Sequence, residues 1–227
     1  MKLLTVTFLL ASLVFASASG VAWAGPIFLK AHGGFSLFNP DDVNDALDRF
    51  NAEAGGPFLD HIGTGLDVGL SAGYSLNAEL GLGLGYARLS SSSGFSWRGY
   101  LFEYDLPADL YEIFLDYLPA NDRKFRVGAG ASSGMIRSAA ALRFEDPVEG
   151  NLQVPFNGNG FLFTGYILVD AVLAPAWSLF GQAGFRHAII SDLKVDGKTI
   201  LNPDSLDDKL RFNYSGLFLR VGIQFRP

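Results

Sequence analysis

The residues of this chain that could do chemistry are charged side chains set inside strand-like segments. Where apolar residues alternate with polar or small ones, the charges fall on one parity: Lys30, Asp67, Glu79, Glu112, Asp116, Arg126, Asp170, Arg186 and Arg220. A strand points successive side chains to opposite faces, so these charges share one side of a sheet. Charges in a narrow, low-dielectric space have to be paired. We therefore predict an ion-paired network in the interior.

The network has a predicted arrangement and two possible roles. Glu79, Asp116, Arg126 and Asp170 fall near the same strand ends, so we expect a mutually paired ring there. Such a ring can be a structural plug that satisfies its own charges and blocks diffusion. It can also be a gate whose pairs exchange partners to admit small solutes. We take the plug as the main hypothesis and keep the gate as its alternative.

The elements that carry these charges are strands, because alternation recurs about eight times along the chain. In the last segment Leu217, Leu219, Val221, Ile223 and Phe225 share one face. Phe218, Arg220, Gly222 and Gln224 share the other. The predicted strands cover residues 27–38, 64–74, 79–89, 111–117, 125 to about 144, 161–173, 177 to about 190, and 214–225.

Short and long connections alternate between these strands. Residues 75–77, 119–124 and 174–176 are tight turns, and the long connections are 39–63, 90 to about 107, 145–160 and 192–212. Short periplasmic turns and long extracellular loops are the pattern of bacterial barrels. The predicted fold is all-β: an eight-stranded antiparallel up-and-down transmembrane β-barrel that forms one domain.

The glycines indicate which face meets lipid. A soluble barrel would turn the apolar rows inward and expose the rows with Gly81, Gly83, Gly85, Gly128 and Gly130 to water. Glycine weakens a strand but suits a crowded interior, such as that of an eight-stranded barrel. Aromatic residues also gather near both ends of the apolar rows, as at membrane interfaces. We therefore expect lipid outside.

The composition and the first residues are consistent with export to a membrane. The chain has 227 residues, 49% of them hydrophobic, with 27 glycines and no cysteine. Lys2, the apolar run 3–15 and Ala22-Trp23-Ala24 have the layout of a secretory signal peptide. We expect a signal peptide at residues 1–24 and the barrel domain at residues 25–227.

This layout, with the closing segment Leu217-Phe218-Leu219-Arg220-Val221-Gly222-Ile223-Gln224-Phe225, resembles the small outer-membrane barrels of Gram-negative bacteria. These are the families of outer-membrane proteins A, X and W. The resemblance implies a monomer in the bacterial outer membrane, inserted by the outer-membrane assembly machinery. Members usually end on an aromatic residue that this machinery recognises. Here Arg226 and Pro227 follow Phe225.

A second inward-facing set is apolar: Leu110, Phe114, Leu162, Tyr166, Phe180 and Phe218. It can be ordinary filling of a narrow barrel. It also resembles the patch that the protein W family uses to pass small hydrophobic molecules. The two interpretations stay open.

Two of the long connections contain helix signals. Asn39-Pro40-Asp41-Asp42 has an N-cap, a proline and first-turn acids, and Gly55-Gly56 ends the segment. Asn202-Pro203-Asp204 repeats the start, followed by Leu206 and Leu210. We predict two short helices at the outer rim.

Arginines near the outer strand ends suggest a lipid partner. Arg88, Arg98, Arg137 and Arg143 lie at or above the ends of the third to fifth strands. Arginine matches phosphate geometry well, so these residues could bind lipopolysaccharide phosphates. Solvated loop charges are the alternative.

Catalytic patterns are weak in this sequence. Outer-membrane lipid A deacylases carry a His-x-Ser pair, but Arg186-His187-Ala188 has no serine at that spacing, and Ser191 is four residues away. His32, His61 and His187 have no metal-ligand spacing. We expect no enzyme activity, no cofactor, no metal and no nucleic-acid partner. The main hypothesis is a non-enzymatic envelope or surface-interaction protein. The alternative is a narrow porin-like channel for small hydrophobic molecules.

Overall fold

The computed structural model describes residues 27–38, 40–56, 60–97, 100–119, 124–146, 150–191, 193–195, 197–199, 201–202, 205–209 and 211–227. The expected signal peptide, residues 1–24, lies outside the described residues.

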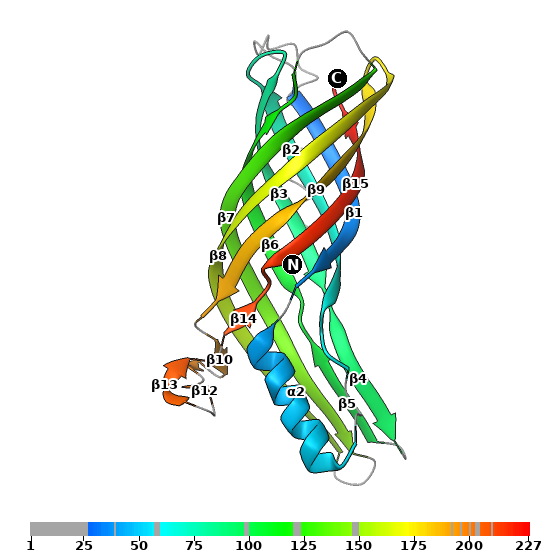
Figure 1. The fold of residues 1–227 in the computed structure, drawn as a ribbon. Coiled ribbons are helices and arrows are strands. Elements are labelled where there is room, and N and C mark those ends of the chain that lie inside the picture. The colour runs from blue at the N-terminus through cyan, green and yellow to red at the C-terminus, as the bar shows by residue number, and fades with distance from the viewer. Residues whose placement is uncertain are drawn as a thin grey trace.

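Eight long strands form a closed antiparallel ring (Figure 1). In ring order they are β1 (Ile27–Leu37), β2 (Thr64–Ser75), β3 (Leu80–Ser90), β6 (Ala108–Tyr117), β7 (Phe125–Asp146), β8 (Gly150–Ala174), β9 (Trp177–Ile190) and β15 (Gly216–Phe225). The ring closes where β15 pairs with β1, from Leu29 opposite Phe225 to Ser36 opposite Phe218. The predicted eight-stranded up-and-down barrel is confirmed.

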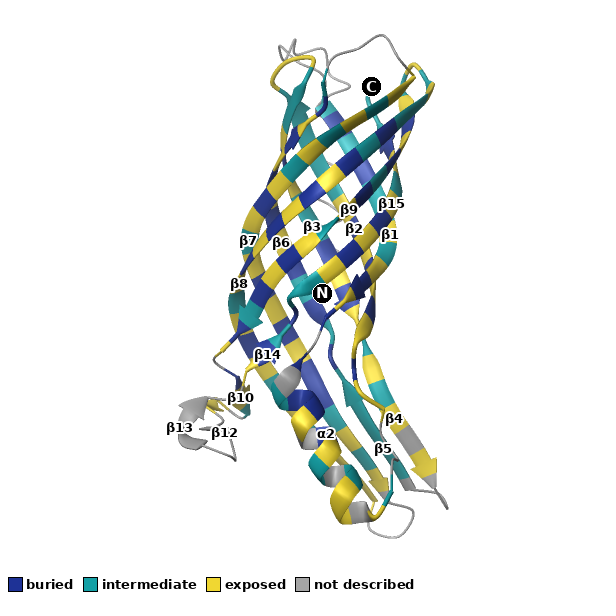
Figure 2. Cartoon of the chain, in the orientation of Figure 1, coloured by how far each residue is buried: buried dark blue, intermediate teal, exposed yellow. Residues whose placement is uncertain are grey.

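The outer wall of the ring is apolar. Buried and exposed residues alternate along each barrel strand (Figure 2), and the exposed ones include Phe161 at 74% and Leu84 at 65% exposure. So much exposed apolar surface is unfavourable in water but suits lipid. The barrel therefore spans a membrane with its apolar rows outward. Among the described residues, no helix is both long and apolar enough to cross a membrane.

The two ends of the barrel differ in their connections. Short turns join β2 to β3, β6 to β7 and β8 to β9, and the C-terminus lies at this end (Figure 1). In membrane barrels of this kind the short turns face the periplasm. We call this end the periplasmic end and the opposite one the outer end.

At the outer end the sheet continues beyond the ring. The hairpin of β4 (Ser92–Trp97) and β5 (Tyr100–Asp105) prolongs β3 and β6, and β5 pairs with β7 from Leu101 opposite Glu145 to Asp105 opposite Ala141. Helix α2 (Asp41–Ala54) lies alongside (Figure 1). We call β4, β5, α2 and the outer parts of β7 and β8 the outer extension.

The predicted loop 145–160 is largely strand. Strand β7 continues to Asp146, β8 begins at Gly150, and the two remain in register from Phe125 opposite Ala171 to Asp146 opposite Gly150. Asparagines and glycines at 157–160 suggest a loop, but ladder hydrogen bonds involve the main chain and do not need apolar side chains. Gly150 has a φ of 97°, which favours glycine at the reversal.

The predicted first rim helix is confirmed as α2. It begins at Asp41, one residue later than expected, and Gly55 ends it with a φ of 80°. Its buried face contains Val43 and Leu47. Asn44 fixes it to the chain that follows, because its amide nitrogen donates to the Ile62 carbonyl oxygen (3.1 Å) and its oxygen accepts from the Ile62 N–H (2.9 Å).

The predicted second rim helix is wrong. Strand β12 (Leu201–Asn202) pairs with β13 (Ser205–Lys209), with Asn202 opposite Ser205. The segment is too short to offset the cost of helix nucleation without a packing surface. Pro203, Asp204 and Leu210 lie outside the described residues. The other short strands near it are β10 (Lys194–Val195), β11 (Lys198–Thr199) and β14 (Phe212–Asn213).

Replacing an inward glycine should destabilise the barrel. At Gly83 an added Cβ would clash with the Phe114 ring and the Ala72 carbonyl oxygen. Gly83→Val should therefore lower the free energy of unfolding by roughly 1–3 kcal/mol, as overpacking does. The measurement is urea unfolding in lipid vesicles. The control is Gly165→Val on the outer wall, where a Cβ meets nothing within 4 Å. Equal stability of the two variants would contradict the close packing at Gly83.

Candidate functional site

A cluster of four charged side chains lies in the middle of the lumen. Arg186 of β9 and Arg220 of β15 both reach Asp67 of β2, with nitrogen–oxygen distances of 2.7 Å and 3.0 Å. Arg220 also contacts Glu112 of β6 at 3.3 Å. All four are buried, with Asp67 at 0% and Arg186 at 1% exposure. We call Asp67, Glu112, Arg186 and Arg220 the central ion cluster.

Neighbouring groups support the cluster. The Ser132 hydroxyl donates to Glu112 (2.8 Å), and the Ser36 hydroxyl donates to Asp67 (3.4 Å). The Phe218 ring lies near both guanidinium carbons, 5.5 Å from that of Arg186 and 4.8 Å from that of Arg220. Cation–π contacts of this kind stabilise a desolvated cation.

A second charged layer lies nearer the periplasmic end. The Lys30 ammonium pairs with Asp116, which also accepts a 2.6 Å hydrogen bond from the Tyr166 hydroxyl. Three rings surround the ammonium at 5.1–5.3 Å from their centroids: Phe28, Phe114 and Phe180. We call Lys30, Asp116 and Tyr166 the lysine layer.

A third group of charges lies at the periplasmic mouth. Arg126 pairs with Asp170, and Arg226 approaches the same carboxylate at 3.8 Å. Glu79 lies in the β2–β3 turn and lines a bowl of about 460 Å³ together with Arg126 and Arg226. Asp116 also lines this bowl but pairs with Lys30 of β1 and not with Arg126, so the predicted ring of Glu79, Asp116, Arg126 and Asp170 is not one mutually paired set.

Arg226 is a member of the mouth that the sequence pattern does not indicate, because it lies beyond the last alternating strand. Its position directly after Phe225 is the one available signal. Arg226 lies after the last membrane-spanning strand. Burial lowers the pKa of its guanidinium, while the carboxylate of Asp170 opposes this change.

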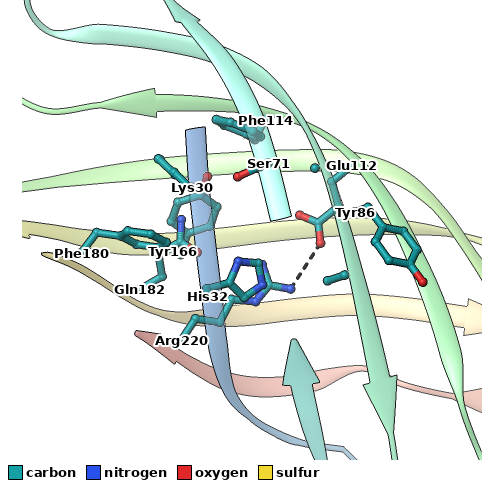
Figure 3. A pocket seen from close by; sticks show the side chains of 12 residues that line it. Lys30, His32, Ser71, Tyr86, Glu112, Phe114, Tyr166, Phe180, Gln182 and Arg220 are labelled. Atoms are coloured by element: carbon teal, nitrogen blue, oxygen red, sulfur yellow. Dashed lines mark hydrogen bonds and ion pairs between the residues drawn. The ribbon is translucent and has the colours of Figure 1, made fainter. Parts of the chain in front are cut away.

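A small cavity of about 30 Å³ lies between the lysine layer and the central ion cluster (Figure 3). Lys30, His32, Glu112 and Arg220 line it. His32 Nε2 and Asp67 Oδ1 are 3.4 Å apart, and both atoms are buried without a hydrogen bond. A polar cavity of this size has room for about two ordered water molecules.

The predicted apolar patch does not form one surface. All six residues are buried, but they belong to different levels of the lumen. On β6 the inward order is Leu110, Glu112 and Phe114, and on β8 it is Leu162, Thr164 and Tyr166. Charged or polar side chains therefore separate Leu110 and Leu162 from the other four: Phe114, Tyr166, Phe180 and Phe218.

Leu110 and Leu162 belong to an outer apolar cluster that fills the outer mouth. Its other buried members are Phe38, Val43, Leu47, Ile62, Ala87, Leu89, Leu106, Ala108, Ile136, Ala140, Ala188, Ile190, Leu193, Phe212 and Tyr214. Tyr104 of the outer extension packs against it, with its ring 6.2 Å from Phe156 and 6.5 Å from Phe212. Burial raises the pKa of the Tyr104 hydroxyl, so it stays neutral.

The arginines expected at the outer strand ends face away from the lumen. Arg88 of β3 and Arg143 and Arg137 of β7 are exposed. Arg88 pairs with Asp109 at 3.2 Å, and Arg143 lies 3.5 Å from Glu103 and 3.7 Å from Asp105. Arg98 lies outside the described residues. Among the described residues, no group of three or more potential ligands could hold a metal ion.

The fold and the site define an eight-stranded transmembrane β-barrel whose interior carries layers of paired charges. No protein-family model matches the chain, and no curated protein matches it. Solved structures with a similar fold include neisserial surface protein A, with 16% sequence identity, 88% of this chain and 97% of that chain covered, and a TM-score of 0.47.

Two further similar structures are outer-membrane or attachment proteins by name. A major outer membrane protein from Thermus thermophilus has 13% identity, covers 88% of this chain and 99% of its own, and has a TM-score of 0.49. Ail, the attachment invasion locus protein of Yersinia pestis, has 11% identity, covers 89% and 99%, and has a TM-score of 0.47. Likeness at this level concerns overall fold and carries no information on ligands.

Removing the shared carboxylate should be the most damaging single change in the central ion cluster. Asp67→Asn leaves Arg186 and Arg220 without their common partner in a buried site. We expect a loss of about 3–5 kcal/mol in the free energy of unfolding, typical of a broken buried pair. Urea unfolding in lipid vesicles measures it. Asp109→Asn on the outer wall, where the ion pair is partly exposed, should cost about 1 kcal/mol or less. A small loss of unfolding free energy for Asp67→Asn would contradict this expectation and would mean that water replaces the ion pairs with Arg186 and Arg220.

Proposed function

We propose that this chain is an integral outer-membrane barrel whose lumen is closed and whose function is performed by its outer surface. In this proposal it is a non-enzymatic envelope or surface-interaction protein. The predicted signal peptide, the apolar wall and the unequal ends support the location. The layered charges of the lumen support the closure.

The observation that carries the closure is the contact between Arg220 and Glu112 (3.3 Å). Strands β15 and β6 are four places apart in the ring in either direction, so this pair crosses the full width of the lumen. The Lys30–Asp116 pair, from β1 and β6, crosses it again nearer the periplasm. A solute would have to separate both desolvated pairs to pass, which is costly for buried charges.

A narrow channel for small hydrophobic molecules is the second candidate. The outer apolar cluster favours it, because an apolar solute could enter among its side chains. The central ion cluster opposes it, since an apolar molecule cannot replace the hydrogen bonds that these charges would lose.

The outer extension supports a role in surface interaction. Besides its apolar packing, α2 makes three polar contacts: the Asn44–Ile62 pair, a 2.8 Å hydrogen bond from the Arg211 N–H to Asp42, and a 2.8 Å contact between Asp48 and His61 Nε2. The opposite face of α2 is solvent-exposed and acidic, with Asp45, Asp48 and Glu53. A fixed, charged wall projecting from the membrane is suited to contact with other molecules.

One histidine–serine contact has to be weighed against the non-enzymatic part of the proposal. On the outer wall His187 Nδ1 lies 3.4 Å from the Ser215 hydroxyl, a proximity that sequence spacing does not indicate. That hydroxyl accepts a 2.9 Å hydrogen bond from the Ala188 N–H, at the gap between β14 and β15. Among the described residues, no carboxylate pairs with His187, so the orienting group of a triad is missing.

A closed lumen predicts no transport. Liposomes containing the protein should take up sugars and small apolar solutes no faster than protein-free liposomes, because two ion pairs cross the lumen. Light-scattering swelling and fluorescent-solute uptake measure these rates, with an open porin as the positive control. Faster uptake of apolar solutes alone would support the channel and reject closure.

The proposed orientation can be tested with single cysteines, since the chain has none. Asp45→Cys on α2 should react with a membrane-impermeant maleimide on intact cells. Ala78→Cys, exposed in the β2–β3 turn, should react only after the outer membrane is permeabilised. The reverse pattern would overturn the assignment of the two ends.

A further inference from the structure

A hollow of about 660 Å³ lies on the outside of the barrel wall, near its outer end. Its lining comes from six strands, β1, β2, β3, β4, β5 and β7, with a contribution from β8. The size falls within the range of small-molecule sites. The central ion cluster and the cavities of the lumen take no part in it.

The hollow forms where the barrel changes into the outer extension. The β3–β6 hairpin is interrupted at Ser91 and at Leu106–Pro107, between the barrel strands and the β4–β5 hairpin. The neighbouring strand β7 presents the small side chains of Ala139 and Ala141 beside this break. Interrupted strands beside small residues leave the wall recessed.

The lining combines three kinds of chemistry. Phe35 and Leu66, which are opposite each other on β1 and β2, continue the apolar wall into one side of the hollow. Three residues with hydroxyl groups, Thr64, Ser90 and Ser91, also line the hollow, and the Ser91 hydroxyl donates to the Thr64 carbonyl oxygen. Arg88, Arg143, Asp105 and Gln153 provide charge and an amide. This combination suits a ligand with acyl chains, sugar hydroxyls and phosphates.

The arginines of the hollow are exposed enough to reach such a ligand, although Arg88 also pairs with Asp109 at 3.2 Å. The side chains of Arg88 and Arg143 are 53% and 47% exposed. The two carboxylate contacts of Arg143 are long, at 3.5 Å and 3.7 Å, and exposed pairs of this kind are weak. A phosphate offers a bidentate, charge-assisted partner, which is stronger. Asp105 can then accept hydrogen bonds from sugar hydroxyls.

Arg137 adds a cation next to the hollow. It lies two residues before Ala139 on the same outward face of β7 and is opposite Asp109. It has no ion-pair partner of its own among the described residues. Arg137 and Arg143 thus flank the two alanines, roughly 20 Å apart along an extended strand.

We propose that this hollow binds the phosphorylated sugar headgroup of lipopolysaccharide, with its acyl chains along Phe35 and Leu66. The inference deepens the proposed function and rests on its outer-membrane orientation, which exposes this wall to the outer leaflet. The serines, Thr64 and Asp105 distinguish the site from a simple cationic belt, because they match the several hydroxyl groups of a sugar headgroup.

The test measures binding of lipopolysaccharide to the full-length mature protein in detergent micelles. Arg88→Gln/Arg143→Gln removes both cations of the lining and should weaken binding by roughly tenfold or more, as expected when charge-assisted hydrogen bonds are lost. Ala139→Trp fills the hollow without changing its charge and should also weaken binding. Arg211→Gln, an exposed cation of the outer end outside the hollow, should leave binding unchanged.

A comparison of ligands distinguishes lipopolysaccharide from other sources of phosphate. Lipopolysaccharide treated with phosphatase should bind more weakly, and neither inorganic phosphate nor phosphatidylglycerol should compete at equal concentration. Undiminished binding in both hollow variants, or equal binding of the dephosphorylated lipid, would overturn the proposal, as would equal competition by either phosphate source. Heat-dependent gel migration confirms that each variant is folded. Because uptake and cysteine labelling are measured separately, failure here is distinguishable from failure of the proposed function.

Discussion

The buried carboxylate of Asp67 is the constraint on which the interior depends. A lone carboxylate inside a narrow barrel is strongly unfavourable, so it needs cations from the same enclosed space. Arg186 and Arg220 supply them from β9 and β15, and Arg220 continues to Glu112 on the opposite side of the ring. The cluster therefore forms only when strands distant in sequence have closed the barrel.

The same parity that forms the cluster also forms the membrane-facing wall. A slip of one residue in the register of β15 would turn Arg220 toward lipid and Leu219 or Val221 toward the lumen. Both changes are costly, one because a charge enters hydrocarbon and the other because Asp67 loses a partner. Pairing inside and apolar side chains outside therefore specify one register. Inward glycines such as Gly83 support it by leaving room for rings such as Phe114.

Much of the fold follows from the period-two pattern, and the site follows only in part. Alternation predicts the barrel, its eight strands and the faces of Asp67, Glu112, Arg186 and Arg220. Parity assigns a face but gives no height, which depends on register between strands. For this reason the expected ring at the mouth is divided between two sets of pairs, with Asp116 bound to Lys30 and Arg126 bound to Asp170.

Other differences arise where local signals are weaker than pairing between strands. The polar stretch 157–160 lies in a strand because β7 pairs with it, and Asn202 begins a hairpin although it resembles a helix cap. The contact between His187 and Ser215 is also invisible to spacing, since it joins β9 to the segment before β15. In each case a partner distant in sequence determines the structure.

The outer extension connects the lumen to the outer surface. Its helix adds Val43 and Leu47 to the cluster that fills the outer mouth. Its hairpin begins at the break around Leu106–Pro107, and the wall is recessed at the same place. The outer extension therefore both fills the outer mouth and produces the hollow on the outer wall. Under the proposed function such a barrel offers no path through the membrane, and its outer extension and hollow are the surfaces that it presents to lipid and to the medium. Substitutions that change the function are then expected in the outer extension and the hollow, because substitutions there leave the ion pairs of Asp67 intact.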